Sequence, residues 1–202
     1  MDERSTRERI IDAADQLFYQ RGFERTSFAE IADLVQISRG NFYHHFKSKD
    51  EILDAVIAQR LAQTRAMLDA WSANGRNPAE RIRCFIKILI RNFADIEHYG
   101  CPVGTLNNEL AKLQHAAKDE ARALFTAFRE WLCEQFEEMG CGDASDALAM
   151  HLLGRVQGVS TLANAFQDEA FVVSEVQQMC EWVDGLARAK RRTVKKPVQH
   201  SR

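Results

Sequence analysis

The chain has 202 residues, of which 46% are hydrophobic and 28% are charged, a composition typical of an ordinary globular protein of one or two domains. Its formal net charge of -2 gives no overall sign of a nucleic-acid partner, so such a partner would have to be recognised by a local basic patch. No apolar run approaches the roughly 18 residues that a membrane span needs, and the charged first residues are unlike a secretory signal. We therefore expect a cytoplasmic protein without a membrane partner.

The cysteines are widely scattered and include no closely spaced pair: Cys84, Cys101, Cys133, Cys141 and Cys180. An odd number at such spacing argues against a disulfide framework and against a structural zinc site. The sequence also lacks a glycine-rich loop of the kind that binds phosphates. We expect no metal and no cofactor, and we expect most of these cysteines to be small buried hydrophobes.

The hydrophobic pattern predicts helices along almost the whole chain. Three prolines and ten glycines are few for this length, and few interruptions favour long helices. Apolar residues recur at helical spacing between capping residues and glycine or proline breaks. The predicted helices cover about residues 4–20, 27–35, 38–46, 49–71, 78–96, 106–113, 117–139, 145–166 and 171–189. The fold class is therefore predicted to be all-α.

The domain organisation follows from the lengths of these helices. Three short helices predict a small N-terminal domain at residues 1–47, and the longer helices predict a larger helical domain at residues 48–189. Residues 190–202 are rich in lysine and arginine, contain no acidic residue and have little apolar content, so we predict a disordered basic tail.

The last two predicted helices have the pattern of a subunit interface. Apolar residues with the 4, 3, 4, 3 spacing of a coiled-coil seam are Val172, Val176, Met179, Val183 and Leu186. Gly154 and Gly158, four residues apart on the preceding helix, would let another helix approach closely. Two such helices from each of two subunits predict a four-helix bundle across a two-fold axis. The alternative is that both stripes pack inside one monomer.

The third predicted helix has the properties of a helix that enters the major groove of DNA. Phe42 and Phe46, four residues apart, form an anchoring face, while other side chains point away from it. Arginine suits guanine edges and asparagine suits adenine edges, and hydroxyls, lysines and helix N-termini suit phosphates. The predicted DNA-binding residues are Thr26, Ser27, Ser38, Arg39, Gly40, Asn41, Tyr43, His44, Lys47 and Lys49.

This segment resembles a known family. Residues 26–46, with the pattern Ser38-x-Gly40-x-Phe42-Tyr43-x-His45-Phe46-Lys47-x-Lys49, closely resemble the TetR family of bacterial transcriptional regulators. The upstream pattern Ile10-x-x-Ala13-Ala14-x-x-Leu17-Phe18-x-x-x-Gly22-Phe23 matches the first helix of that family, and the resemblance covers about residues 4–64. It implies that residues 1–47 are a helix-turn-helix DNA-binding domain and that residues 48–189 are a sensor and dimerisation domain. The protein would be a homodimer that binds a near-palindromic operator in double-stranded DNA and is released when a small molecule binds the C-terminal domain. The resemblance also implies a repressor more than an activator.

One position departs from the family pattern. The turn before the third helix has Gln36 where the family usually has glycine. A residue other than glycine costs about 1 kcal/mol in a left-handed conformation. We therefore expect the turn to differ slightly without loss of DNA binding.

The sequence does not name the inducer, but it offers candidate contacts in the middle helices. The aromatic and polar candidates are Phe85, Phe93, Tyr99, Asn107, Phe128, Trp131 and His151, each of which is more often a core residue than a ligand contact. Cys101 lies between Gly100 and Pro102 at the expected start of a helix, where the helix dipole favours a thiolate. The Gly-Cys pair also resembles the electrophile- and oxidant-responsive branch of the family. We hypothesise a redox or electrophile switch at Cys101, against the alternative of a buried structural cysteine.

Other functional classes account for less of the sequence. An enzyme would need Cys101 paired with His98 or His115, but no orienting third group or oxyanion site accompanies them, so we do not expect an enzyme. A transcriptional activator of the same fold stays open. A helical interaction protein without DNA binding also stays open, although the outward-facing polar residues of the third helix argue against it.

Overall fold

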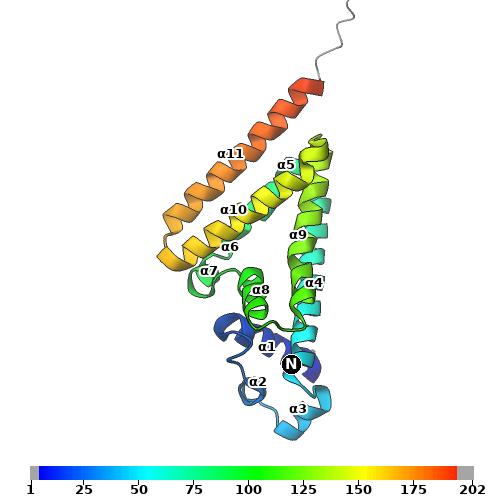
Figure 1. The fold of residues 1–202 in the computed structure, drawn as a ribbon, viewed down its shortest axis with the longest axis vertical. Coiled ribbons are helices and arrows are strands. Elements are labelled where there is room, and N and C mark those ends of the chain that lie inside the picture. The colour runs from blue at the N-terminus through cyan, green and yellow to red at the C-terminus, as the bar shows by residue number, and fades with distance from the viewer. Residues whose placement is uncertain (1–4, 195–202) are drawn as a thin grey trace, which may run out of the picture. The chain divides into compact units, whose positions relative to one another are not determined.

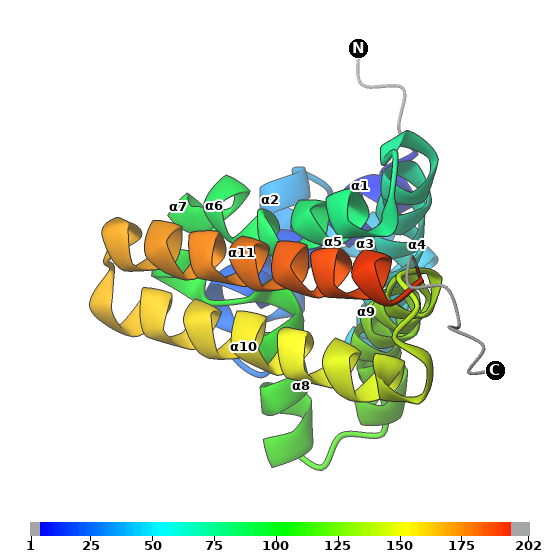
Figure 2. The ribbon, with the colours of Figure 1, turned by 90° about the horizontal axis from the view of Figure 1, so that it is seen from above.

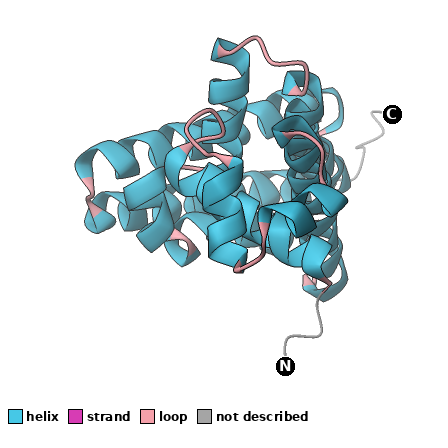
Figure 3. Ribbon diagram, turned by 90° about the horizontal axis from the view of Figure 1, so that it is seen from below, coloured by secondary structure: helices cyan, strands magenta, loops and turns pink. Residues whose placement is uncertain are grey.

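The computed structural model describes residues 5–194, and residues 191–194 by their backbone alone. Within this range the chain consists of helices joined by short loops, with no strand (Figure 3). The predicted all-α fold is confirmed. No helix in the described part of the chain has an apolar stretch long enough to span a membrane.

The helices begin and end at residues that cap them. Ser5 and Ser27 each form a capping box at the start of a helix, and Pro78 occupies the first turn of another behind the Asn77 cap. In chain order the helices are α1 (Thr6–Arg21), α2 (Phe28–Val35), α3 (Arg39–His45), α4 (Lys49–Asn74), α5 (Pro78–Ile86), α6 (Ile88–Arg91), α7 (Phe93–Tyr99), α8 (Pro102–Lys112), α9 (Lys118–Glu138), the short 3-10 helix η1 (Gly142–Ala144), α10 (Ser145–Phe166) and α11 (Glu169–Val194) (Figure 1).

The single helix predicted at residues 78–96 is wrong in its continuity, because the structure divides this stretch into α5, α6 and α7. The backbone leaves the helical path at Lys87, with ψ of -7°, and again at Asn92, with φ of -106° and ψ of 17°. The apolar residues still face the core in each piece, since Ile82, Leu89 and Ile96 are all buried. A periodic apolar pattern survives such breaks, so it could not reveal them.

The predicted start of the disordered basic tail at residue 190 is wrong. Helix α11 continues to Val194, so residues 190–194 extend the helix. The rest of the predicted tail, residues 195–202, lies outside the described residues.

The described chain forms two compact units. The first contains the residues up to Ala66 together with Cys101–Ala127, and the second contains Met67–Gly100 and the chain from Phe128 onward. Helices α4 and α9 contribute residues to both units. The predicted division at residue 47 cuts the chain once. The first unit instead also includes a later segment, because α8 packs with the N-terminal helices.

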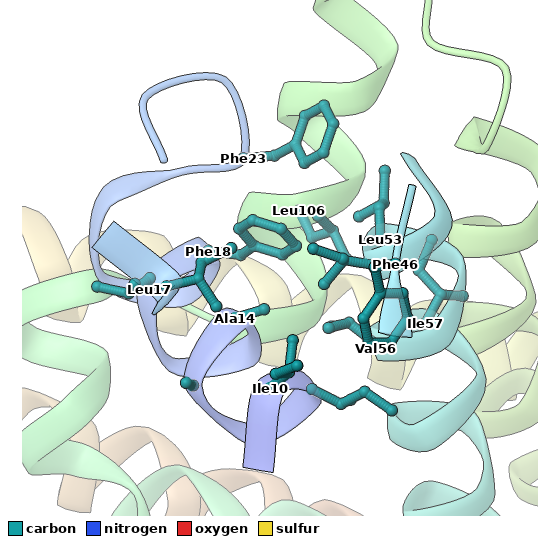
Figure 4. Packing of buried hydrophobic residues seen from close by; sticks show 14 of the residues in the cluster. Ile10, Ala14, Leu17, Phe18, Phe23, Phe46, Leu53, Val56, Ile57 and Leu106 are labelled. Carbon is teal, nitrogen blue, oxygen red and sulfur yellow. The ribbon is translucent and has the colours of Figure 1, made fainter. Parts of the chain in front are cut away.

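The core of the first unit joins α1 to α4 and α8. Ile10 and Phe18 of α1 are buried together with Leu53 of α4, and Leu106 of α8 lies among them (Figure 4). Each such side chain contributes roughly 1.5–3 kcal/mol when it is removed from water. This cluster holds α8 against the helices that carry the helix-turn-helix.

The second unit is built around α10 and α11, which lie side by side (Figures 1 and 2). Four residues of the predicted dimer seam are 0–4% exposed in this single chain, namely Val172, Val176, Met179 and Val183, while Leu186 is half-buried. These four side chains pack in the core of the second unit, where α11 contacts α5, α6 and α10. The prediction for the α11 seam is therefore corrected, because these side chains belong to the core of this chain. The alternative, that both stripes pack inside one monomer, holds for the α11 seam only, since Gly154 and Gly158 of α10 are exposed.

Candidate nucleic-acid interface

The start of α2 is fixed by a reciprocal pair of hydrogen bonds. The Ser27 hydroxyl accepts from the Glu30 amide at 3.3 Å, and the Glu30 carboxylate accepts from the Ser27 amide at 2.8 Å. The backbone hydrogen bond from Ser27 is the main cause that lowers the pKa of Glu30. Ser27 itself is exposed, so its hydroxyl lies at the surface beside the first turn of α2.

The turn between α2 and α3 has the left-handed conformation in which glycine is favoured. Gln36 has φ of 59° and ψ of 46°, and its amide donates to the carbonyls of Ala32 and Asp33 at the end of α2. The expectation that glutamine changes the turn is thus corrected: Gln36 adopts the left-handed conformation, in which its amide caps α2 between buried Val35 and partly buried Ile37.

Helix α3 is anchored by its aromatic face. Phe42 and Phe46 are 1% and 2% exposed, and the ring of Phe28 from α2 packs edge-on against Phe42 at 5.2 Å. Ser38 caps the helix, since its hydroxyl accepts from the Asn41 amide at 3.3 Å. With this face buried, the remaining positions of α3 must point outward.

The predicted base-contacting residues share that outward surface. Arg39, Gly40, Asn41 and His44 are exposed, and the Tyr43 side chain is 48% exposed. No Cβ placed on Gly40 would meet another atom within 4 Å, so the backbone is open to close approach there. The surface offers hydrogen-bond donors, acceptors and one positive charge on a rigid support, which is what reading of base edges requires.

A hollow of about 310 Å³ lies between α2 and α3. It is lined by Ser27, Phe28, Ala29, Ala32, Arg39, Phe42 and Tyr43. The hollow therefore shares Ser27, Arg39 and Tyr43 with the predicted DNA-binding set, and it belongs to the same surface.

Two predicted phosphate contacts are engaged within the protein. Thr26 is 2% exposed, and its hydroxyl donates to the Gly22 carbonyl at 2.8 Å. The Lys49 ammonium donates to the carbonyls of Phe23, Glu24 and Thr26 at 3.0–3.2 Å and lies 4.3 Å from the centre of the Phe23 ring. Both side chains fasten the loop between α1 and α2, so we remove them from the set of direct phosphate ligands.

Lys47 keeps an exposed side chain at the end of α3. Its ammonium donates to the Tyr43 carbonyl, and its amide donates to the Glu51 carboxylate at 2.7 Å. The ammonium has further donor hydrogens for a phosphate. Lys47 thus extends the outward surface of α3, whereas Lys49 does not.

The predicted ligand-binding aromatic residues of the second unit form pairs. Phe85 and Phe128 pack at 5.4 Å between ring centres, and Trp131 packs on Trp71 at 5.8 Å. The Trp131 indole N–H donates to the Ser72 hydroxyl at 2.8 Å, which satisfies its one polar group. These three predicted contacts are buried core residues. His151 lies exposed against Trp182, and Phe93 and Tyr99 are half-buried.

The other two predicted ligand contacts belong to the first unit. Asn107 of α8 donates to the carbonyls of Val103 and Ala121, which occupies both amide hydrogens. Cys101 is half-buried at the N-terminus of α8, and its carbonyl accepts from Thr105. The structure therefore divides the predicted ligand contacts between the two units.

Two polar residues that the sequence did not single out hold the first unit together. Arg60 is 9% exposed and bridges the Asp15 carboxylate at 2.5 Å and the Pro102 carbonyl at 2.8 Å. Glu109 accepts from the amides of Phe23 and Glu24. These contacts join residues more than 40 positions apart, so no local pattern could have indicated them. Among the described residues no group of three or more histidine, cysteine, aspartate or glutamate side chains is placed to hold a metal.

The fold and this surface define the chain as a helix-turn-helix DNA-binding regulator. Residues 10–56 match the model of the N-terminal domain of bacterial regulatory proteins of the tetR family, and residues 78–178, half of the chain, match the model of the transcriptional regulator LmrA/YxaF-like C-terminal domain. The chain belongs to the TetR family of transcriptional regulators. The family and the relatives below are regulators and not enzymes, which sets the enzyme alternative aside.

Individual relatives agree with this assignment. An uncharacterised helix-turn-helix transcriptional regulator of Lactococcus lactis is 28% identical over 169 residues, which cover 82% of this chain and 86% of the relative. The transcriptional repressor KstR2 of Mycobacterium tuberculosis is 31% identical over 113 residues, 54% of this chain and 53% of that protein. A solved TetR regulator from Legionella pneumophila is similar with a TM-score of 0.80 and 26% identity, over 92% of this chain and 98% of that one.

Proposed function

We propose that the chain is a homodimeric repressor that binds a near-palindromic operator through α3 and leaves it when a small molecule binds the second unit. Because such an operator is chromosomal, the protein acts in the cytoplasm. The observation that carries the proposal is the outward surface of α3, where Arg39, Asn41, Tyr43 and His44 are exposed on a helix anchored by buried aromatic residues.

The proposed DNA contacts divide into two kinds. Arg39 and Asn41 are assigned to base edges, since their bidentate donors and acceptors match guanine and adenine. Ser27 at the start of α2, with Tyr43 and Lys47, is assigned to phosphates on either side of the groove. His44 completes the exposed surface, and Ser38 acts indirectly as the cap of α3.

Fluorescence anisotropy with the DNA upstream of the protein's own gene tests this assignment. We expect salt-dependent, sequence-preferring binding by the wild type. Arg39→Ala combined with Tyr43→Ala should weaken it about 100-fold, since a good base contact contributes roughly 1–3 kcal/mol and the Tyr43 phosphate contact is lost as well. Arg65→Ala, an exposed arginine on α4, is the matched control and should bind as the wild type does. Equal binding by the double variant and the wild type would refute the role of α3.

Helix α10 supplies the proposed dimer surface. An exposed stripe of residues four apart runs along it: Met150, Gly154, Gly158, Leu162 and Phe166. Phe166 is 73% exposed, and a Cβ on either glycine would meet no atom within 4 Å. Residues spaced by four form the ridges that interlock when two helices pack, and a second copy offers the same self-complementary ridge. This stripe replaces the buried α11 residues in the proposed interface, together with Val173, which is 44% exposed.

The inducer site is proposed for the second unit, around its aromatic pairs. Phe85, Phe128 and Trp131 would provide apolar walls, and the half-buried Phe93 and Tyr99 belong to the same unit. A ligand releases the operator only if it binds the free conformation of the protein more tightly than the DNA-bound conformation. Repression is favoured over activation because one relative is named a repressor and because a dimer in the groove blocks polymerase without further contacts. The hypothesis of a switch at Cys101 is retained as a prediction.

A further inference from the structure

The loop between α1 and α2, residues 22–27, is held by polar groups on two sides. From α8, the Glu109 carboxylate accepts from the Phe23 amide at 2.9 Å with one oxygen and from the Glu24 amide at 3.0 Å with the other. From the start of α4, the Lys49 ammonium donates to three carbonyls of the same loop. One residue thus satisfies the loop's donors, and another satisfies its acceptors.

The contact with Glu109 is built into the backbone of the loop. Gly22 has φ of 93°, and a Cβ at this position would lie 2.8 Å from a Glu109 carboxylate oxygen. The absence of a side chain at Gly22 gives the carboxylate room to reach both amides. The Phe23 ring is enclosed by Phe18, by His115 at 5.1 Å and by the Lys49 ammonium, so the loop is also packed from its apolar side.

What this loop positions is the start of α2. Thr26 is buried against Gly22, and Ser27 directly follows as the N-cap of α2. Ser27 is exposed and borders the hollow between α2 and α3. A displacement of residues 23 and 24 therefore moves the first turn of α2, where backbone amides are suited to a phosphate.

We propose that Glu109 is a positioning residue for DNA binding: from α8 it holds the α1–α2 loop so that the N-terminus of α2 reaches a backbone phosphate. Glu109 does not touch DNA in this proposal. The inference rests on the proposed DNA-binding function and adds to it a residue that lies outside the helix-turn-helix in the sequence. It also assigns α8 a part in the geometry of the DNA-binding surface.

The test compares Glu109→Gln with the wild type in the full-length chain. Glutamine has the size of glutamate, but its side-chain NH₂ would face the backbone amide of either Phe23 or Glu24. One charge-assisted hydrogen bond is then lost, and two N–H groups oppose each other. We expect operator affinity to fall about tenfold. We expect this loss at every salt concentration, with the slope of log affinity against log salt unchanged, because the lost phosphate contact is made by uncharged backbone amides of α2 that release no counterion.

The affinity of the active molecules separates positioning from stability. A variant that is merely less stable has a smaller active fraction, which a titration at stoichiometric operator concentration measures, and its active molecules keep the wild-type affinity. Glu8→Gln is the matched control, because Glu8 also accepts a backbone amide, that of Ser5, but at the start of α1. It should keep both the affinity of the active fraction and the protection of the loop.

Amide hydrogen exchange provides the second measurement, independent of DNA. Phe23 and Glu24 should exchange slowly in the wild type and faster in Glu109→Gln, while the Glu8→Gln protein matches the wild type. If Glu109→Gln does not fold, Glu109→Asp replaces it, since its shorter side chain cannot reach both amides. An unchanged operator affinity of the active fraction in the substituted protein would overturn the inference. Absence of salt-dependent binding by the wild type would instead overturn the proposed function, and the exchange experiment would still test the contact.

Discussion

The outward surface of α3 and the exposed stripe of α10 are opposite in chemistry but alike in construction. On α3, buried Phe42 and Phe46 fix the helix, and polar side chains face outward. On α10, buried Val156 and Val159 fix the helix, and Leu162 with Phe166 faces outward. Each helix packs one face into the core of its unit and leaves another face exposed. This difference indicates the partner that each surface suits. The polar surface of α3 suits a hydrated DNA duplex, and the apolar stripe of α10 suits the same stripe of a second copy, as proposed above.

The largest expected effect distinguishes the buried face of α3 from its exposed face. Phe42→Ala should destabilise the protein by about 3–5 kcal/mol, because it leaves a cavity where Phe28 and the core of the first unit pack. The adjacent Tyr43→Ala should change stability by no more than about 0.5 kcal/mol and weaken operator binding instead. Urea denaturation beside anisotropy measures both. Comparable stability losses for the two neighbours would contradict the described orientation of α3.

The next effect concerns the stripe of α10. Leu162→Glu combined with Phe166→Glu should convert the proposed dimer to a monomer, because four charges would face one another across its two-fold axis without partners. Operator affinity should then fall about 100-fold through loss of the second half-site. Sedimentation velocity gives the mass. Leu113→Glu, which changes an exposed leucine of the first unit, is the control and should leave the mass unchanged.

A smaller effect is expected at the turn between α2 and α3. Gln36→Gly should stabilise the first unit by up to about 1 kcal/mol, since glycine adopts the left-handed conformation without a Cβ penalty. The greater freedom of glycine in the unfolded chain offsets part of this gain. Thermal unfolding measures the shift, and operator binding should be retained. A clear destabilisation would mean that the glutamine side chain makes a contribution larger than the strain.

The smallest effect is the pH dependence of the α2 cap. The pKa of Glu30 is lower in the folded protein than in the unfolded chain. The Glu30 carboxylate therefore contributes its full stabilisation above the ordinary glutamate pKa of roughly 4.3. This contribution is lost as the pH falls through the lowered pKa of the folded protein. Glu30→Gln should therefore be less stable than the wild type near pH 7, with the difference closing at acidic pH. Denaturation midpoints at pH 7 and pH 3 check this. A difference that stays constant between the two would contradict the sign.

The two faces also differ in how far the sequence could predict them. The α3 surface was predictable because Phe42 and Phe46 mark the buried side within one short helix, and the rest follows from helical geometry. On α10 and α11 the sequence did not separate exposed from buried residues: both Gly154 and Gly158, which are exposed, and the regular seam on α11, which is buried, were assigned to the interface. A heptad-like spacing is satisfied equally by a partner subunit and by neighbouring helices of the same chain.

Long-range polar contacts lay beyond the sequence altogether. Thr26 and Lys49 have the residue types of phosphate contacts, and only the fold places them against the α1–α2 loop. Glu109 and Arg60 contact residues distant in the chain, and an isolated glutamate or arginine on a helix is usually a solvated charge. The packing of α8 with the N-terminal helices was unpredicted for the same reason.

The most direct test of the account is a protection footprint of the wild-type protein on the DNA upstream of its gene. We predict two equivalent protected regions in adjacent or repeated turns of the same face of the duplex, related by a near two-fold axis, with guanines in the major groove shielded by α3. Substitution of Arg39 by alanine should remove the guanine protection in both regions. A single asymmetric protected region, or guanine protection that survives Arg39→Ala, would contradict the claim that a dimer reads the operator through α3.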